Sequence, residues 1–266
     1  MPCRHSRLGR PGRINRKQVS GMDFLQPHIR LSSSHGARCA LLPGDPARLE
    51  RIRPYLEGYE ELAFNREFRS AIGSYKGVRV LAMSTGIGGA SAAIALEELR
   101  RLGVTSMIRI GSCGALQPEV KLGDLVLVCG AVREDGASRM YAEEAFPAVP
   151  DAGLLFACAQ AAKEGGYPHH IGLARSHDSF YTDQEDELHA HWSKRGVLGS
   201  DMETAALYVA GRLRGVACMS ILNNVVSCGE DTAGSIGSYV DGEDASMRGE
   251  QNEILVALEA FTRTGS

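Results

Sequence analysis

Arg109 is the residue of this 266-residue chain whose position points most directly to chemistry. It interrupts the apolar run of residues 106–110, which is typical of a buried strand, and the sequence Gly111-Ser112-Cys113-Gly114 follows it. A guanidinium inside a buried strand is costly unless it meets an anion. That anion is either a carboxylate of the chain itself or a bound oxyanion, for which Ser112 and the glycine backbone would supply further donors. The sequence therefore predicts an anion site where this strand ends.

A second candidate for anion binding is the glycine-rich turn of residues 85–91, between a predicted strand and a predicted helix. Ser91 replaces the third glycine of a dinucleotide-binding GxGxxG fingerprint, and the chain has no Gly-Lys-Ser or Gly-Lys-Thr of a P-loop. The backbone N–H groups of this turn could still hold an anion, or the turn could be tight and bind nothing. Arg48 and Arg66 also follow turn sequences, and each by itself could equally be a surface charge.

Further side chains are suited to a sugar and a base. Glu203 stands at a predicted helix start, where it favours the helix dipole, but together with Asp201 it could accept hydrogen bonds from a diol. Phe180 could stack on a flat heterocycle or pack in the core. His28 is interpreted as an exposed histidine near the start of the chain. The histidines between residues 169 and 191 lack the spacing of a zinc site, so no metal site is predicted.

Strand-like and helix-like segments alternate after residue 22, with glycine-rich turns between them. This alternation predicts an α/β fold, a single domain over residues 23–266, and ligands at the carboxyl ends of the strands. Residues 229–249 are rich in Gly, Ser and Asp and are predicted to form a loop or lid. The predicted strands are residues 37–42, 78–84, 107–110, 125–128 and 216–226; the predicted helices begin at residue 46 and span 90–102, 151–164, 202–213 and 251–261.

The charge balance of the chain hides a basic start. Residues 1–22 contain six Lys or Arg and no acid, so the net charge of −3 becomes −9 without them. We expect this extension to be disordered or not native, with translation starting at Met22; an organelle transit peptide is the alternative. No nucleic-acid partner is expected, because the net charge of −3 gives no general attraction to nucleic acid. No membrane is expected either, because no apolar run approaches the roughly 20 residues that cross a bilayer. Seven cysteines without a CxxC pair favour a cytoplasmic location.

Together these residues resemble the nucleoside phosphorylase family, which includes uridine phosphorylase and the hexameric purine nucleoside phosphorylases. The resemblance implies a three-layer sandwich with a central mixed β-sheet flanked by helices. It also implies a hexamer, a trimer of dimers, whose active sites are shared across the dimer interface. No cofactor is expected, because inorganic phosphate is the co-substrate. The matching strings keep the family's order along nearly the whole chain beyond the basic start: residues 42–48, 65–68, 84–89, 109–114, 146–149 and 201–203.

The resemblance also assigns a role to individual residues. Arg109 and Glu203 would carry the catalysis, because fixing the phosphate dianion and the sugar for in-line attack supplies most of the rate enhancement. The expected phosphate ligands are Gly44, Arg48, Arg109, Ser112 and, from the neighbouring subunit, Arg66. The expected ribose ligands are Met202, Glu203 and His28, which would reach across the dimer. The expected base ligands are Phe180, Gln184 and Asn224.

The positions that would read the base depart from both branches of the family. Uridine phosphorylases place a Gln and an Arg after the Phe-Tyr pair; Gln184 is present, but Asp186 stands where the Arg is expected. A second family Arg aligns near Cys228, and the Asp of the purine branch falls on Val225 or Val226. The expected activity is uridine phosphorylase-like cleavage of the N-glycosidic bond by phosphate, giving free base and (deoxy)ribose 1-phosphate. Purine phosphorolysis and a non-catalytic nucleoside- or anion-binding homologue remain as alternatives.

Overall fold

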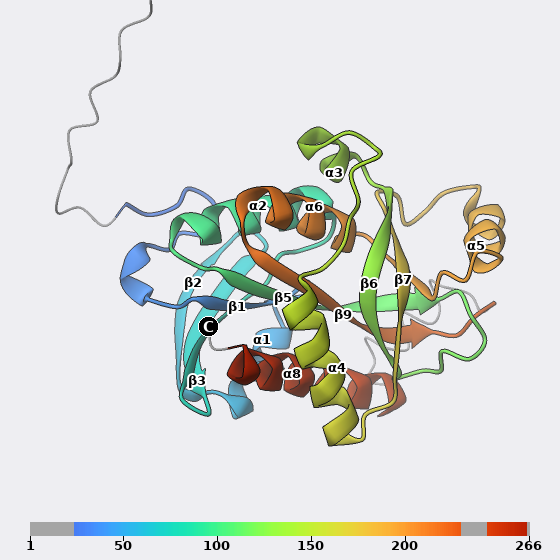
Figure 1. Cartoon of the computed structure of the whole chain (residues 1–266). Helices are drawn as coiled ribbons and strands as arrows, with labels where there is room; N and C mark the ends of the chain where they lie inside the picture. Colours follow the sequence, from blue (N-terminus) through green and yellow to red (C-terminus); the bar gives the residue numbers. More distant parts are fainter. Residues whose placement is uncertain (1–23, 230–243, 265–266) are drawn as a thin grey trace, which may run out of the picture.

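A nine-stranded mixed sheet with helices on both faces forms the framework of the chain (Figure 1). The computed structural model describes residues 24–229 and 244–264. The strands are β1 (Cys39–Pro43), β2 (Glu57–Asn65), β3 (Phe68–Tyr75), β4 (Val78–Met83), β5 (Ser106–Ala115), β6 (Leu125–Glu134), β7 (His169–His177), β8 (Gly199–Asp201) and β9 (Ala217–Val226). The helices are α1 (Arg48–Ile52), α2 (Gly89–Arg101), α3 (Gly136–Tyr141), α4 (Ala152–Gly165), α5 (Glu185–Ser193), α6 (Thr204–Arg214) and α8 (Asp244–Arg263), with 3-10 turns η1 (Ser33–His35) and η2 (Arg53–Tyr55).

The strand order places β5 at the centre of the framework. The sheet runs β2-β3-β4-β1-β5-β8-β7-β6-β9, and β9 also pairs with β5. Because of this extra pairing, the strands β5, β8, β7, β6 and β9 close into a barrel-like ring next to the open part of the sheet. The strands β1, β4, β5 and β9 that flank the centre pair in parallel, so their carboxyl ends lie at one edge. Arg109 lies in β5 and comes before that edge.

Alternate side chains of the central strands enter two hydrophobic clusters, one on each face of the sheet. Leu42 and Met107 belong to the cluster that α2 and α6 cover. Leu41 and Ile108 belong to the cluster that α1, α4 and α8 cover. Figure 1 shows these two groups of helices on opposite faces of the sheet. This arrangement confirms the predicted three-layer α/β sandwich, and it follows from the two-residue period of a strand that is buried on both faces.

The elements predicted from the sequence are present in the described chain, but β2, β3, β7, β8, α3 and α5 were not predicted. The strands and helices predicted from residue 37 to residue 226 are present with small shifts at their ends. The prediction of a loop or lid over residues 229–249 is wrong from residue 244 onward, where α8 begins. A Cβ atom on Gly249 would lie 2.0 Å from Asn223 Oδ1, so glycine serves there as a close helix contact rather than as a loop residue. Residues 1–22 and 230–243 lie outside the described part.

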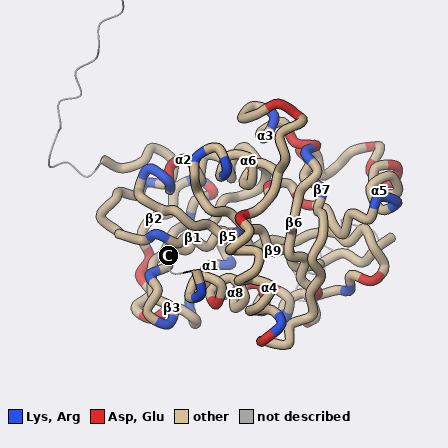
Figure 2. The backbone as a smooth tube through the Cα atoms, viewed as in Figure 1, with Lys and Arg blue, Asp and Glu red and all other residues tan. Residues whose placement is uncertain are grey.

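Charges of both signs are interspersed in the view of Figure 2, where neither sign gathers over one region. Among residues 24–229 and 244–264, no helix is long and apolar enough to span a bilayer. The same residues contain no cluster of three or more His, Cys, Asp or Glu side chains suited to a metal ion.

Candidate functional site

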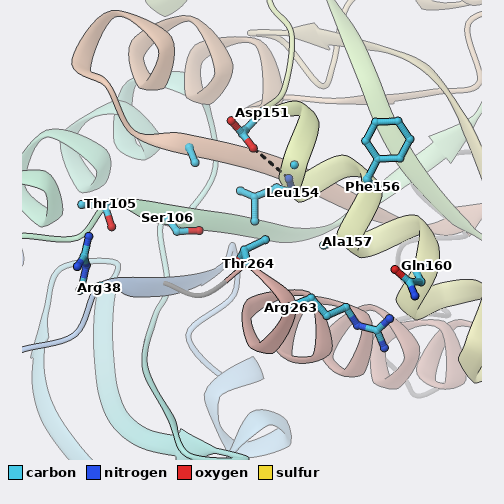
Figure 3. Close-up of a pocket in the computed structure, with 12 residues that line it drawn as sticks. Arg38, Thr105, Ser106, Asp151, Leu154, Phe156, Ala157, Gln160, Arg263 and Thr264 are labelled. Atoms are coloured by element: carbon cyan, nitrogen blue, oxygen red, sulfur yellow. Dashed lines mark hydrogen bonds between the residues drawn. The ribbon is translucent and has the colours of Figure 1, made fainter.

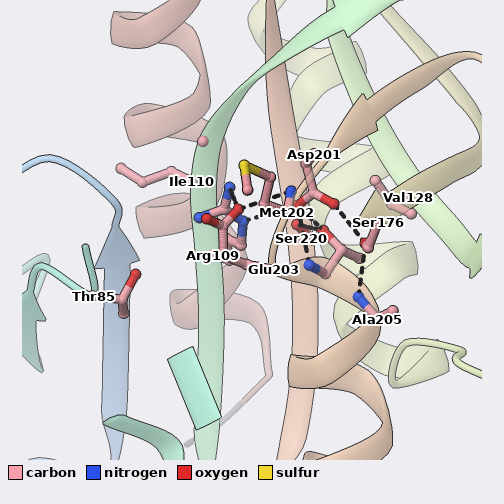
Figure 4. A network of polar contacts seen from close by, with 12 residues as sticks. Thr85, Arg109, Ile110, Val128, Ser176, Asp201, Met202, Glu203, Ala205 and Ser220 are labelled. Carbon is pink, nitrogen blue, oxygen red and sulfur yellow. Dashed lines mark hydrogen bonds and ion pairs between the residues drawn. The ribbon is translucent and has the colours of Figure 1, made fainter. Parts of the chain in front are cut away.

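Arg109 is buried at the centre of a polar network in the middle of the molecule (Figure 4). Its Nε donates to Asp201 Oδ2 at 3.2 Å, and its Nη2 lies 2.5 Å from Glu203 Oε2. Its Nη1 is buried and has no hydrogen-bond partner among the described residues. The sequence left two partners open for Arg109, a carboxylate of the chain or a bound oxyanion. Two carboxylates of the chain pair with it, and its Nη1, unpartnered among the described residues, still has donors for an oxyanion.

Asp201, at the end of β8, is occupied by the protein itself. Its Oδ1 accepts a hydrogen bond from Ser176 Oγ at 2.6 Å. Its Oδ2 accepts from the backbone N–H of Thr204 at 3.0 Å and from Thr204 Oγ1 at 2.6 Å, besides the bond from Arg109. The interpretation that Asp201 joins Glu203 in holding a diol is therefore wrong: Asp201 caps the start of α6 and fixes Arg109, and its oxygens are used.

Glu203 directly precedes α6 and is held by the glycine-rich turn before α2. The backbone N–H of Gly88 donates to Glu203 Oε1 at 2.6 Å, and that of Met202 donates to Oε2 at 3.2 Å. Gly88 has φ +96°, a backbone conformation that favours glycine. Burial raises the pKa of Glu203, although Arg109 beside it acts in the opposite direction. The turn predicted to bind an anion thus binds the carboxylate of Glu203.

Gly44 brings the turn after β1 to the same place. A Cβ atom on Gly44 would lie 4.0 Å from Arg109 Nη1 and 3.3 Å from the carbonyl oxygen of Gly86. The backbone can approach the unused guanidinium nitrogen because the side chain is missing. Gly44, Arg109, Met202 and Glu203 therefore lie close together, and the resemblance assigns them to phosphate and ribose. Ser112 lies further along β5 and is half-buried.

Arg48 lies on α1, and acids of α8 that the sequence analysis did not single out surround it. Its Nη1 donates to Glu253 Oε1 and to the carbonyl oxygen of Ile110, each at 3.1 Å, and its Nε lies 3.0 Å from Glu250 Oε2. Both acids are fully buried. A signal for them exists in the sequence: they stand three residues apart on the same face as Ile254 and Ala257, where the helix should present apolar residues. Arg48 thus lies against β5 near Arg109, and two carboxylates of α8 hold it there.

Two predicted ligands lie together at another corner of the molecule. Arg66 is exposed, with φ +57°, in the turn between β2 and β3. His28 Nδ1 lies 2.6 Å from Glu98 Oε1 of α2, and the backbone N–H groups of His28 and Ile29 also contact that buried carboxylate. Asn65, next to Arg66, donates a hydrogen bond to the carbonyl oxygen of His28 at 2.7 Å and so links the two segments. Neither residue reaches Arg109 within one chain.

Phe180 lines a cavity of about 650 Å³ at the carboxyl ends of β5 and β9. Gly114, Val226 and the start of α5 also border it. Gln184 is exposed and does not line this cavity among the described residues. Asn224 is fully buried, and its amide donates to the carbonyl oxygens of Val120 and Lys121 at 3.2 and 3.1 Å. The structure thus places Asn224 where it fixes the loop before β6, away from the cavity.

A second cavity, of about 610 Å³, lies where β1, β5 and β9 begin (Figure 3). Arg38, Ser106 and Thr264 border it, together with one side of α4. Arg263 also lines it, and its guanidinium points away from the centre of the opening in Figure 3 and pairs with Glu164 at 2.8 Å. No residue predicted as a ligand lines this cavity within the described chain.

Comparisons with known proteins agree with this geometry. Residues 38–239 match the family model described as the phosphorylase superfamily. The chain is similar to a uridine phosphorylase of Thermococcus kodakarensis, 38% identical over 252 residues, which cover 89% of this chain and 85% of that protein. It is also similar to a guanosine phosphorylase of Halorubrum lacusprofundi, 38% identical over 196 residues, which cover 74% of this chain and 81% of that protein.

A solved structure extends the similarity to the fold. The crystal structure of uridine phosphorylase from Vibrio fischeri superposes with a TM-score of 0.84 and 43% identity, covering 89% of this chain and 96% of that one. The residues matched by the family model, 38–239, include Arg48, Arg109 and Glu203 of this chain.

Proposed function

Because the chain belongs to the phosphorylase superfamily, we propose that it is a uridine phosphorylase-like nucleoside phosphorylase. As a pentosyltransferase it would use inorganic phosphate to cleave the N-glycosidic bond of a nucleoside, giving free base and (deoxy)ribose 1-phosphate. The relatives named uridine phosphorylase support this activity over most of the chain. No cofactor enters the proposal, since phosphate itself is the nucleophile.

The observation that carries the proposal is the buried Nη1 of Arg109, which keeps unused donors beside Gly44. The same guanidinium touches Glu203 through its Nη2. A phosphate oxygen must reach C1′ of the sugar, so the groups that hold phosphate and ribose have to be neighbours. Arg109 lies between Gly44, which has no side chain, and the carboxylate of Glu203, so it is placed between the groups proposed for phosphate and for ribose.

The roles of the residues follow from the bond that changes. A phosphate oxygen attacks C1′, the C1′–N bond breaks, and its electron pair leaves with the base. We assign phosphate to Gly44, Arg48, Arg109 and Ser112, which lie on the turn after β1, on α1 and on β5. We assign the 2′ and 3′ hydroxyls to Glu203, with Met202 beside it, because a carboxylate accepts two adjacent hydroxyl protons and stabilises positive charge on the sugar.

The cavity beside Phe180 is the proposed place of the base. It opens at the carboxyl end of β5, past Arg109 and Ser112, which is where a base would project from a sugar held by Glu203. Gln184, at the start of α5, would have to turn toward the cavity to contact the base. Asn224 would need to leave its present hydrogen bonds to do so.

A purine nucleoside is the second candidate substrate, and two observations favour it. One relative is named guanosine phosphorylase and is as similar in identity as the uridine phosphorylase of Thermococcus kodakarensis. The charged residues among those that line the cavity are acids, Asp183, Glu185 and Asp186, joined by His189 and by no Lys or Arg of the described chain. Carboxylates accept hydrogen bonds, so they suit a base edge that presents N–H groups.

We further propose a hexamer, a trimer of dimers, with Arg66 and His28 completing the site of a neighbouring subunit. Their corner of the molecule supports this assembly, because Phe64 is 65% exposed and Ile87 is 79% exposed there. Large apolar side chains in this position favour burial against another chain. The proposed cytoplasmic location rests on the cysteine content of the sequence.

The test is a substrate panel with the purified full-length chain. Uridine, thymidine, inosine, guanosine and adenosine are incubated with and without inorganic phosphate, and both free base and sugar 1-phosphate are measured. We expect base release to require phosphate and uridine to be cleaved with the highest kcat/KM. Base release without phosphate would sink the phosphorylase assignment, and faster cleavage of guanosine or inosine would favour the purine candidate.

A further inference from the structure

Glu253 of α8 contacts two donors beside the proposed phosphate site. Its Oε1 accepts a hydrogen bond from Arg48 Nη1, and its Oε2 accepts one from the backbone N–H of Gly111, each at 3.1 Å. The carboxylate is fully buried. A guanidinium combined with a glycine N–H is the kind of donor set that an oxyanion takes. Glu253 therefore uses donor groups of the kind that the site would offer to phosphate.

Glu250, one turn earlier in α8, is in a different position. Its Oε1 pairs with Arg51 Nε, and its Oε2 accepts from Arg51 Nη2 at 3.2 Å, in addition to its contact with Arg48. The positive charge of Arg51 therefore balances Glu250. Among the described residues, the ion pair of Glu253 is with Arg48. The charge of Glu253 is thus the one that acts mainly on Arg48.

The charged groups that face Glu253 come from three elements: Arg48 of α1, Glu250 of α8 and Arg109 of β5. Burial raises the pKa of Glu253 to about 8, and Glu250 adds to the rise, while the two arginines oppose it. A phosphate dianion near Arg48 and Arg109 would further disfavour a negative charge on Glu253, since like charges repel in a buried site. Binding of phosphate and protonation of Glu253 are therefore expected to favour each other.

We propose that Glu253 competes with inorganic phosphate for Arg48, and that uptake of a proton by its carboxyl group relieves this competition. Glu253 then sets the affinity of the site for phosphate and makes that affinity depend on pH. The inference rests on the proposed function, because it takes Arg48 as a phosphate ligand. No covalent step is involved, and the proton comes from the solvent.

The first experiment compares the parent chain with Glu253→Gln, which keeps the size of the side chain and removes the charge. At pH 9 the KM for phosphate is expected to fall about fivefold in the variant, and at pH 6.5 the two values should lie within twofold. The kcat and the KM for the nucleoside should stay within twofold, because the variant leaves Arg109 and Glu203 in place. A phosphate KM that rises, or that does not change at pH 9, overturns the proposal.

The matched control is Glu259→Gln, the same change on the same helix. The contacts of Glu259 are with Tyr75, Lys76 and Arg263, on a different part of the molecule from Arg48. Its phosphate KM is expected to stay within twofold of the parent value at both pH values. A second control, Glu253→Gln in an Arg48→Met background, should have no further effect on phosphate KM, because the proposed competition acts through Arg48. An effect of the same size in both backgrounds contradicts the proposal.

A second experiment needs no variant and no turnover. Inorganic sulfate stays dianionic between pH 7 and 9, so its binding reports on titrating groups of the protein alone. Calorimetric titration of the parent chain with sulfate at pH 8.5, in two buffers of different ionisation enthalpy, should reveal uptake of roughly half a proton or more per sulfate. Binding without proton uptake overturns the proposal even if Glu253→Gln does not fold.

The two experiments also separate this inference from the proposed function. Proton-linked sulfate binding by a chain that cleaves no nucleoside would leave the competition intact and refute the phosphorylase assignment. Phosphate-dependent cleavage without proton-linked binding, and with an unchanged phosphate KM in Glu253→Gln, would confirm the assignment and refute the competition.

Discussion

Arg109 and Arg48 are both buried and both face two carboxylates, but the two pairs of acids are built differently. Asp201 and Glu203 come from the end of β8 and the turn that follows it, and Arg109 keeps an unused Nη1. Glu250 and Glu253 come from the C-terminal helix, and one of them also takes a backbone N–H of the strand that carries Arg109. Asp201 and Glu203 orient Arg109, whereas Glu250 and Glu253 restrain Arg48.

The comparison shows that a carboxylate next to a buried arginine has no fixed meaning. Asp201 has a structural role, because Ser176 and Thr204 donate hydrogen bonds to its carboxylate oxygens beside the bond from Arg109. Glu203 is available to a ligand once one of its contacts yields, since its other partners are backbone N–H groups. Glu253 we assign as a competitor. Substitutions that keep shape and remove charge can separate these three roles.

The largest effect is expected from Arg109→Ala. The change removes a group that touches Asp201, Glu203 and the space beside Gly44 together, so we expect kcat/KM for phosphorolysis to fall at least about 10³-fold. Steady-state kinetics with varied phosphate measures it. Arg214→Ala, a surface arginine paired with Glu97, is the control and should stay within twofold. Near-parental phosphorolysis in Arg109→Ala would show that phosphate is held elsewhere.

Glu203→Gln is expected to come next, with a loss of about 10²-fold in kcat/KM. The amide keeps the size of the side chain but removes the charge that faces Arg109 and the developing positive charge on the sugar. The KM for the nucleoside should rise, and the loss of stability should be smaller than that of Asp201→Asn, because burial raises the pKa of Glu203 and weakens the ion pair that the variant loses. Glu97→Gln on the surface of α2 serves as the control. Unchanged nucleoside kinetics would remove Glu203 from the sugar site.

Asp201→Asn should reverse the balance between activity and stability. Asp201 accepts bonds from Arg109, Ser176 and Thr204, and an amide nitrogen would face at least one of these donors. We expect a loss of about 3 kcal/mol in the free energy of unfolding, typical of a broken buried ion pair, and only about a tenfold loss of kcat/KM. Thermal denaturation beside kinetics measures both. If Asp201→Asn keeps its stability and loses activity as Glu203→Gln does, Asp201 acts on substrate after all.

The parts of this site that were predicted from the sequence rest on two kinds of signal. Arg109 stands out because a charge in an apolar strand needs a partner, whereas Gly44 was assigned through the resemblance to the family. The acids of α8 were missed although the same rule applies to them: Glu253 lies within the helix predicted over residues 251–261 and Glu250 directly precedes it, but neither was singled out among the apolar residues of that helix. β2 was missed because its side chains are largely exposed and lack alternation. The role of Asp201 depends on Ser176 and Thr204, which only the fold brings to it.

The smallest expected effect is the contribution of Glu253, the partner of Arg48, to the pH dependence of the protein's stability. Folded Glu253 keeps its proton up to about pH 8, whereas in the unfolded chain a glutamate releases it near its ordinary value of 4.5. Between these values the folded state binds more protons, so the free energy of unfolding falls as the pH rises through this window, and Glu253 adds no further change above it. Glu253→Gln cannot titrate. We therefore expect the Tm of the parent to fall about 5 °C more than that of the variant between pH 6 and pH 9.

Calorimetric or fluorescence melts of the two proteins at pH 6, 7.5 and 9 measure this difference, with Glu259→Gln as the control that should follow the parent. Equal slopes in the parent and in Glu253→Gln would mean that the Glu253 carboxylate stays ionised across the range. Arg48 would then be held by a permanent ion pair, as Arg109 is held by Asp201, and the difference between the two arginines would lie in geometry alone.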